Sequence, residues 1–180
     1  MIKIGEYIEV VVEWLTEHGA SFFDLLGGGV ENVIDGILYV LTGVPFYLFI
    51  PAVAVLAWYK SGKGTGLFTL SGLLLIYGMG FWEDTMQTLS LVLSATGLAL
   101  LLGIPLGICM ANSKKCNKIL QPLLDCMQTM PAFVYLIPAV LFFGLGTVPG
   151  AFATIIFALP PVARLTALGI KQVPQNVIEA

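Results

Sequence analysis

The feature that most constrains this chain is a long run without charge toward its C-terminal end. No Asp, Glu, Lys or Arg occurs between Asp125 and Arg164. About 20 apolar residues span the hydrocarbon core of a bilayer, so this run is too long for one crossing and must fold back on itself. Turn-forming residues gather in the sequence GLGTVPG, residues 144–150. The run therefore predicts two antiparallel membrane helices joined there, followed by a polar segment, residues 171–180.

The composition and the placement of charge agree with a membrane protein. Hydrophobic residues make up 58% of the chain and charged residues 11%, whereas soluble domains carry about 25% charged residues. We therefore expect an all-α membrane protein. Acidic residues are concentrated before Gly36, where Lys3 is the one base, so nucleic acid is not expected as a partner.

The N-terminal region combines acidic and apolar residues at helical spacing. In residues 1–18, glutamates and apolar residues alternate every three or four positions, which predicts an amphipathic helix with one acidic face. The glycines of residues 27–29 are expected to end this helix, and a second short amphipathic segment to follow. Residues 1–43 are thus predicted to be an external acidic region. For the helix of residues 1–18 we expect packing on the outer side or against the chain's own membrane helices, with a solvated tail as the alternative.

Basic loops predict the orientation of the remaining spans. Residues 44–84 are expected to hold two accessory transmembrane helices separated by the basic loop KSGKG, and residues 86–111 a third span. A second basic loop follows, with Lys114, Lys115 and Lys118. Because short Lys-rich loops stay in the cytoplasm, about five crossings, an external N-terminus and a cytoplasmic C-terminal segment are predicted.

Within the third span, Gly103 and Gly107 stand four residues apart, which predicts the close approach of another helix. Arg164 is the one charged residue within a predicted span, and we expect it to anchor the helix by snorkelling or by pairing with a carboxylate such as Asp125.

Cysteine and nucleotide motifs are uninformative. The chain has three cysteines, Cys109, Cys116 and Cys126, and no metal-binding spacing with its one histidine, so free thiols and no metal site are expected. The sequence SGKGTG fails the phosphate-binding pattern, because Gly64 stands where Ser or Thr is required. We therefore expect no catalytic residue and no bound cofactor, with any ATP hydrolysed by a separate subunit.

Three stretches carry a resemblance to a known family: PAFVYLIPAVLFFGLGTVPG (131–150), TIIFALPPVARLTALGIKQVP (154–174) and the terminal IEA. Together they resemble the membrane permease of ATP-driven (ABC) importers of the glycine betaine/proline betaine type, and the resemblance extends upstream through residues 67–108. It implies a type I importer permease domain from residue 85 onward. In that family a cytoplasmic helix with a Glu-Ala-Ala motif docks into the ATPase, and Glu179 and Ala180 match its first two positions. Because the chain stops within the motif, a C-terminal truncation is expected.

The resemblance also implies partners and a location. An ABC ATPase would bind the coupling segment from the cytoplasm, with Pro174 starting its helix. A substrate-binding protein would deliver the solute from outside, and a second permease subunit, as a homodimer, would complete the path in the cell (inner or plasma) membrane.

Aromatic and proline residues are the candidates for the translocation path. Four aromatic residues of the predicted fourth span could offer π faces to a quaternary ammonium, or could pack against lipid and neighbouring helices. They are Phe133, Tyr135, Phe142 and Phe143. Four prolines could act as hinges, or be ordinary membrane-helix prolines. They are Pro131, Pro138, Pro160 and Pro161.

Two other functions are left open. A secondary carrier or channel needs carboxylates at membrane depth, and the predicted spans have essentially none. A non-transport membrane scaffold, using the acidic N-terminal helix as its interaction surface, would follow if the truncation is genuine.

Overall fold

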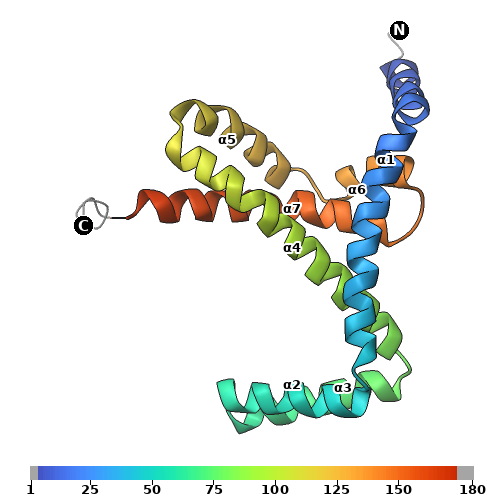
Figure 1. Ribbon diagram of the computed structural model, residues 1–180, viewed down its shortest axis with the longest axis vertical. Coiled ribbons are helices and arrows are strands. Elements are labelled where there is room, and N and C mark those ends of the chain that lie inside the picture. Colours follow the sequence, from blue (N-terminus) through green and yellow to red (C-terminus); the bar gives the residue numbers. More distant parts are fainter. Residues whose placement is uncertain (1–3, 174–180) are drawn as a thin grey trace. The chain divides into compact units, whose positions relative to one another are not determined.

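The computed structural model describes residues 4–173, and every regular element among them is a helix (Figure 1). This confirms the all-α fold. In chain order the helices are α1 (Ile4–Gly43), α2 (Phe46–Ser61), α3 (Lys63–Gly78), α4 (Trp82–Asn112), α5 (Lys114–Thr129), α6 (Phe133–Phe143) and α7 (Thr147–Lys171). The chain forms two compact units, residues 33–91 and the other described residues, and α1 and α4 each have residues in both.

The predicted break at residues 27–29 is wrong, because α1 continues through all three glycines. A glycine lowers the stability of a helix by only about 1 kcal/mol relative to alanine, so packing can override it. Gly27 shows such packing: a Cβ there would lie 3.1 Å from Cδ1 of Phe143. The part of α1 from His18 to Gly43 is long and apolar enough to cross a membrane.

The number of candidate spans is lower than the five predicted. By length and composition, three described helical stretches could cross a membrane: His18–Gly43, Trp82–Asn112 and Thr147–Lys171. A fourth would be α5 together with α6, which are bent by 95° at the break between them. The reason is helix length: α2 and α3 have 16 residues each, whereas a crossing takes about 20.

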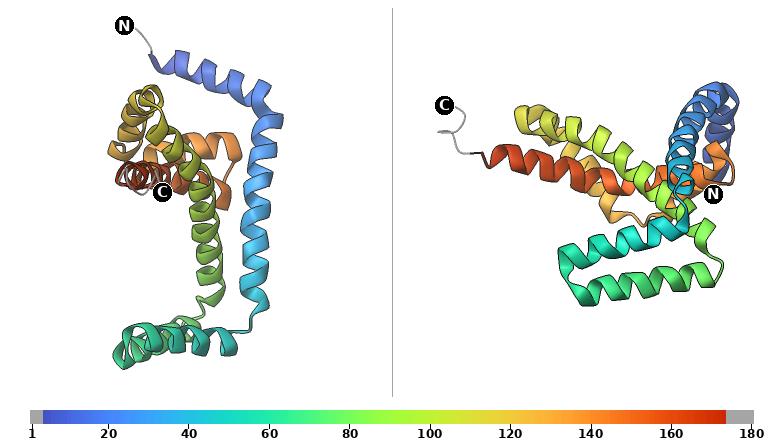
Figure 2. Two further views of the ribbon diagram at one scale, coloured as in Figure 1. Left: turned by 60° about the vertical axis from the view of Figure 1, so that its left-hand side comes forward. Right: turned by 60° about the horizontal axis from the view of Figure 1, so that its bottom comes forward.

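The unit of residues 33–91 contains a helical hairpin (Figure 2). Helices α2 and α3 run antiparallel, and Gly62, with φ 96°, forms the turn within the predicted basic loop. A Cβ on Gly66 would lie 2.6 Å from Cβ of Trp58, so the two backbones approach closely there. The stacked rings of Phe46 and Tyr77, 4.0 Å apart, close the open end of the hairpin.

The other unit is built around α7. Helix α6 turns back onto α7 through Gly144 and Gly146, both with positive φ, as predicted from residues 144–150. Helix α4 crosses α7 at Gly103 and Gly107, where added Cβ atoms would lie 2.6 Å from Val162 Cγ1 and 2.5 Å from Thr166 Cβ. The predicted close helix approach is confirmed.

Helix α5 packs on the far end of α7 and closes a small apolar core. The buried members of this core come from three helices: Met110, Leu124, Ala163 and Ala167. Ser113 caps α5 by accepting a hydrogen bond from the Cys116 backbone N–H at 3.3 Å. This core holds the C-terminal half of α7 in place.

Candidate functional site

The predicted coupling residues Pro174, Glu179 and Ala180 lie outside the described residues, and their role stays a prediction. The structure does describe the helix that leads to them: α7 ends at Lys171, and Gln172 and Val173 are the last residues that the structure describes. The contacts at this end of α7 are therefore the described contacts nearest in sequence to the predicted coupling residues.

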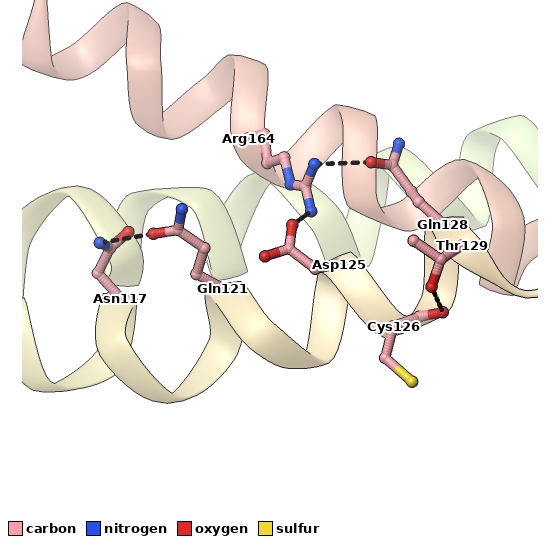
Figure 3. Close-up of polar contacts among 7 residues, drawn as sticks. All are labelled: Asn117, Gln121, Asp125, Cys126, Gln128, Thr129 and Arg164. Carbon is pink, nitrogen blue, oxygen red and sulfur yellow. Dashed lines mark hydrogen bonds and ion pairs between the residues drawn. The ribbon is translucent and has the colours of Figure 1, made fainter.

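Arg164 joins α7 to α5 through two partners (Figure 3). Its Nη2 forms an ion pair with Oδ1 of Asp125, and its Nη1 donates a hydrogen bond to Oε1 of Gln128 at 2.7 Å. Residues three apart share one face of a helix, so Asp125 and Gln128 both reach the guanidinium fork. The predicted pairing of Arg164 with Asp125 is confirmed. The contribution of Gln128 was missed, although its spacing from Asp125 was a usable signal.

A second contact lies two turns further along α7. Lys171 Nζ donates to Oδ1 of Asn117 at 3.5 Å, and Asn117 Nδ2 donates to Oε1 of Gln121 at 3.3 Å. We call Asn117, Asp125, Gln128, Arg164 and Lys171 the polar ladder. It ties the end of α7 to α5 at two levels, through Arg164 and through Lys171.

The four aromatic path candidates are not brought together. Phe133 is 74% exposed on α6, and the hydroxyl of Tyr135 donates to the Met127 carbonyl at 2.9 Å. Phe142 and Phe143 instead pack toward α1, with ring centroids 4.4 Å and 5.8 Å from that of Phe23. A path role for any of the four remains a prediction.

A cavity of about 400 Å³ lies beside these rings. We call it the aromatic–acidic cavity, and its lining residues are Phe23, Asp24, Gly27, Gly28, Glu31, Phe142, Phe143, Gly144 and Val148. The contribution of α1 was not predicted, because residues 1–43 were expected to be an external region and not a span. The spans predicted from residue 44 onward have essentially no carboxylates, whereas Asp24 and Glu31 lie within the additional candidate span His18–Gly43.

The four prolines differ in their settings. Pro131 lies in the break between α5 and α6, where the chain bends by 95°. Pro138 lies inside α6, and Pro160 and Pro161 lie inside α7, which continues through both. A hinge role for these residues stays a prediction, and Pro131 is the one located at an observed bend.

The expectation of three free thiols is wrong for two of them. Cys109, near the end of α4, and Cys116, at the start of α5, form a disulfide, while Cys126 is free and exposed. The two helix ends meet across Ser113, which brings the Cα atoms to 6.3 Å, within the range that a disulfide bridges. Within residues 4–173, no group of three or more His, Cys, Asp or Glu side chains could hold a metal ion.

Comparison with known proteins shows which transport proteins this chain is similar to. Residues 103–180 match the family described as binding-protein-dependent transport system inner membrane component. The chain is 45% identical over 179 residues to the glycine betaine transport system permease protein OpuAB of Bacillus subtilis (strain 168), covering 99% of this chain and 64% of that protein. It is 44% identical over 180 residues to the glycine betaine/proline betaine transport system permease protein ProW of Escherichia coli (strain K12), covering 100% of this chain and 51% of that protein.

The name of a third relative includes carnitine in addition to glycine betaine. The glycine betaine/carnitine transport permease protein GbuB of Listeria monocytogenes serotype 1/2a (strain 10403S) is 45% identical over 183 residues, covering 99% of this chain and 64% of that protein. The chain thus spans between about half and two thirds of the length of these three relatives.

Proposed function

We propose that this chain is part of the permease subunit of an ATP-driven importer, because its residues 103–180 match the family of inner membrane components of binding-protein-dependent transport systems. The proposed solute is glycine betaine, proline betaine or a related compatible solute. The observation that carries this proposal is the 45% identity to a glycine betaine permease over 99% of the chain, including residues upstream of the family match. The subunit itself is no enzyme, and a partner ATPase hydrolyses ATP.

The partners follow from the same proposal. A cytoplasmic ATPase binds the segment after α7, a substrate-binding protein docks from outside, and a second permease subunit, as a homodimer, completes the path. Two contacts support this orientation. Phe23 packs on Phe142 beside the turn before α7, and both regions are predicted to be external. Lys171 contacts Asn117 next to the Lys-rich start of α5, and both are predicted to be cytoplasmic.

The polar ladder supports a mechanism of coupling. When ATP closes the ATPase subunits, the segment after Val173 is displaced together with the end of α7. Because Arg164 and Lys171 bind α5, that displacement moves α5 and α7 together rather than stretching the connection. Their rotation against α4 about the glycine contacts then shifts the permease between inward-open and outward-open states.

Uptake by the complete protein tests the proposal. The full-length permease is reconstituted in liposomes with its proposed partners, an ABC ATPase and a substrate-binding protein, and radiolabelled glycine betaine uptake is measured. We expect uptake that requires ATP inside and the binding protein outside. Uptake driven by an ion gradient without ATP would instead identify a secondary carrier, and the absence of uptake under both conditions would favour a scaffold.

A charge reversal tests the coupling residue. In the complete protein, Glu179→Lys should abolish ATP-driven uptake and weaken the association of the ATPase, because it places a cation where a carboxylate is expected to dock. Glu83→Lys is the matched control, since Glu83 is an exposed acid in the first turn of α4 on the predicted outer side. Normal uptake and ATPase association with Glu179→Lys would contradict the assignment.

A further inference from the structure

The aromatic–acidic cavity has the size and the walls of a small-molecule site. Its volume of about 400 Å³ falls within the range of about 300–1,000 Å³ typical of ligand pockets. Adjacent glycines of α1 have opposite effects on it. Gly27 lets α1 contact Phe143, whereas a Cβ on Gly28 would meet nothing within 4 Å, so the space beside Gly28 is open.

The charges on its walls are of one sign. Asp24 and Glu31 are seven residues apart, which places both on one face of α1, and Gly28 lies between them. No Lys, Arg or His lines the cavity, and neither carboxylate has an ion pair or hydrogen bond with another of the described residues. Carboxylates within a membrane helix are costly unless a cation accompanies them, so the cavity favours a positive ligand.

The rings make an organic cation preferable to a hydrated metal ion. Phe23, Phe142 and Phe143 are packed together along the cavity, with Phe142 stacked on Phe23 and Phe143 edge-on to it. Aromatic rings attract cations that shed water easily, and quaternary ammonium groups are the main ligands recognised in this way.

The cavity also has a place for an anionic group. Helix α7 begins at Thr147, and Gly144 and Val148, on either side of that start, both line the cavity. The residue before α7, Gly146, has no side chain with which to cap the first N–H groups. A helix N-terminus attracts carboxylates, so a ligand with both charges would be oriented, its cation toward α1 and its carboxylate toward α7.

We propose that the aromatic–acidic cavity binds a zwitterion with a quaternary ammonium group and a carboxylate. The site is formed by α1 together with the turn between α6 and α7, and it therefore assigns a ligand-binding role to the N-terminal helix. The choice of ligand rests on the proposed function, because the chemistry of the walls matches the solutes named for the relatives.

Direct binding to the complete permease, without ATPase or binding protein, tests this site. Radiolabelled glycine betaine is measured by equilibrium dialysis against the full-length protein in nanodiscs, with tetramethylammonium and acetate as competitors. We expect tetramethylammonium to compete and acetate to compete more weakly. Phe142→Leu should weaken glycine betaine binding roughly two- to thirtyfold, the effect of losing one cation–π contact. Asp24→Asn with Glu31→Gln should weaken it further.

Matched variants separate binding from folding. Phe157→Leu removes an exposed ring of α7 that does not line the cavity, and Asp35→Asn removes an exposed α1 carboxylate that does not line it either, so both should bind like the wild type. Gly28→Leu fills the open space while keeping a good helix former, so it should abolish binding without lowering the melting temperature.

Each outcome bears on one proposal. Wild-type binding by Phe142→Leu and Gly28→Leu, or no binding by the wild type, would overturn the assignment of the cavity. If these variants lose binding as expected while the complete system shows no ATP-dependent uptake, the cavity stands and the proposed importer function fails.

Discussion

Replacing Gly107 by alanine should loosen the crossing of α4 and α7. The added Cβ would lie 2.6 Å from the carbonyl oxygen of Ala163 and 2.5 Å from Cβ of Thr166. The carbonyl belongs to the α7 backbone and cannot rotate away. To restore a contact of 3.4 Å from 2.6 Å, the two helices must separate by about 0.8 Å at this point. Ala163 and Ala167 are buried beside it, so the separation also opens the small core.

Overpacking of this kind costs about 1 to 3 kcal/mol. Replacing glycine by alanine in a helix also contributes up to about 1 kcal/mol of stabilisation, which would hide part of the effect. Gly97 provides the matched control, because it lies in the same helix and a Cβ there would meet nothing within 4 Å. Both variants gain the higher helix propensity of alanine. The difference between their unfolding temperatures therefore reports only the steric clash of the added Cβ at residue 107 with α7.

The assay is thermal unfolding of the full-length protein in one detergent, followed by tryptophan fluorescence. We expect Gly97→Ala to unfold at or above the temperature of the wild type, and Gly107→Ala clearly below it. Equal unfolding temperatures for the two variants would refute the inference that α4 and α7 touch backbone to backbone at Gly107.

Two further predictions concern the contact between α5 and α7 and the disulfide between α4 and α5. Arg164→Gln should weaken the docking of α5 on α7 by about 0.2 to 1 kcal/mol, the range for exposed ion pairs, and Asp125→Asn should cost little more in that background; fully additive losses of unfolding temperature would argue against the ion pair. In protein purified without reductant, a maleimide should label Cys126 but not Cys109 or Cys116, and after reduction it should label all three, as read by mass spectrometry of the peptides. Labelling of all three before reduction would show that the disulfide does not form.

Several features could be predicted because their signals are local. The glycine-rich turn of residues 144–150 lies between two apolar runs, and it joins α6 to α7. Gly103 and Gly107 share one helix face, and α7 crosses there. Arg164 needed an acidic partner, and Asp125 was the nearest carboxylate in the sequence before it.

Other features depended on contacts between distant segments. Glycines in residues 27–29 indicated a helix break, but α1 continues because Gly27 packs against Phe143. Nothing in the sequence around Phe23 indicates that it stacks on Phe142. The aromatic–acidic cavity could therefore not be predicted from the sequence. Phe142 and Phe143 were predicted as path residues, but their contacts with Phe23 were not.

The sequence by itself determined that the chain is helical and membrane-embedded, where its charges gather and which glycines permit close packing. In a bilayer each helix satisfies its own backbone hydrogen bonds, so these properties are settled segment by segment. Only the tertiary structure decided which faces meet, placing α1 beside α6 and α5 beside α7. The apolar faces of membrane helices are chemically alike, and their pairing depends on the detailed fit of side chains far apart in the sequence.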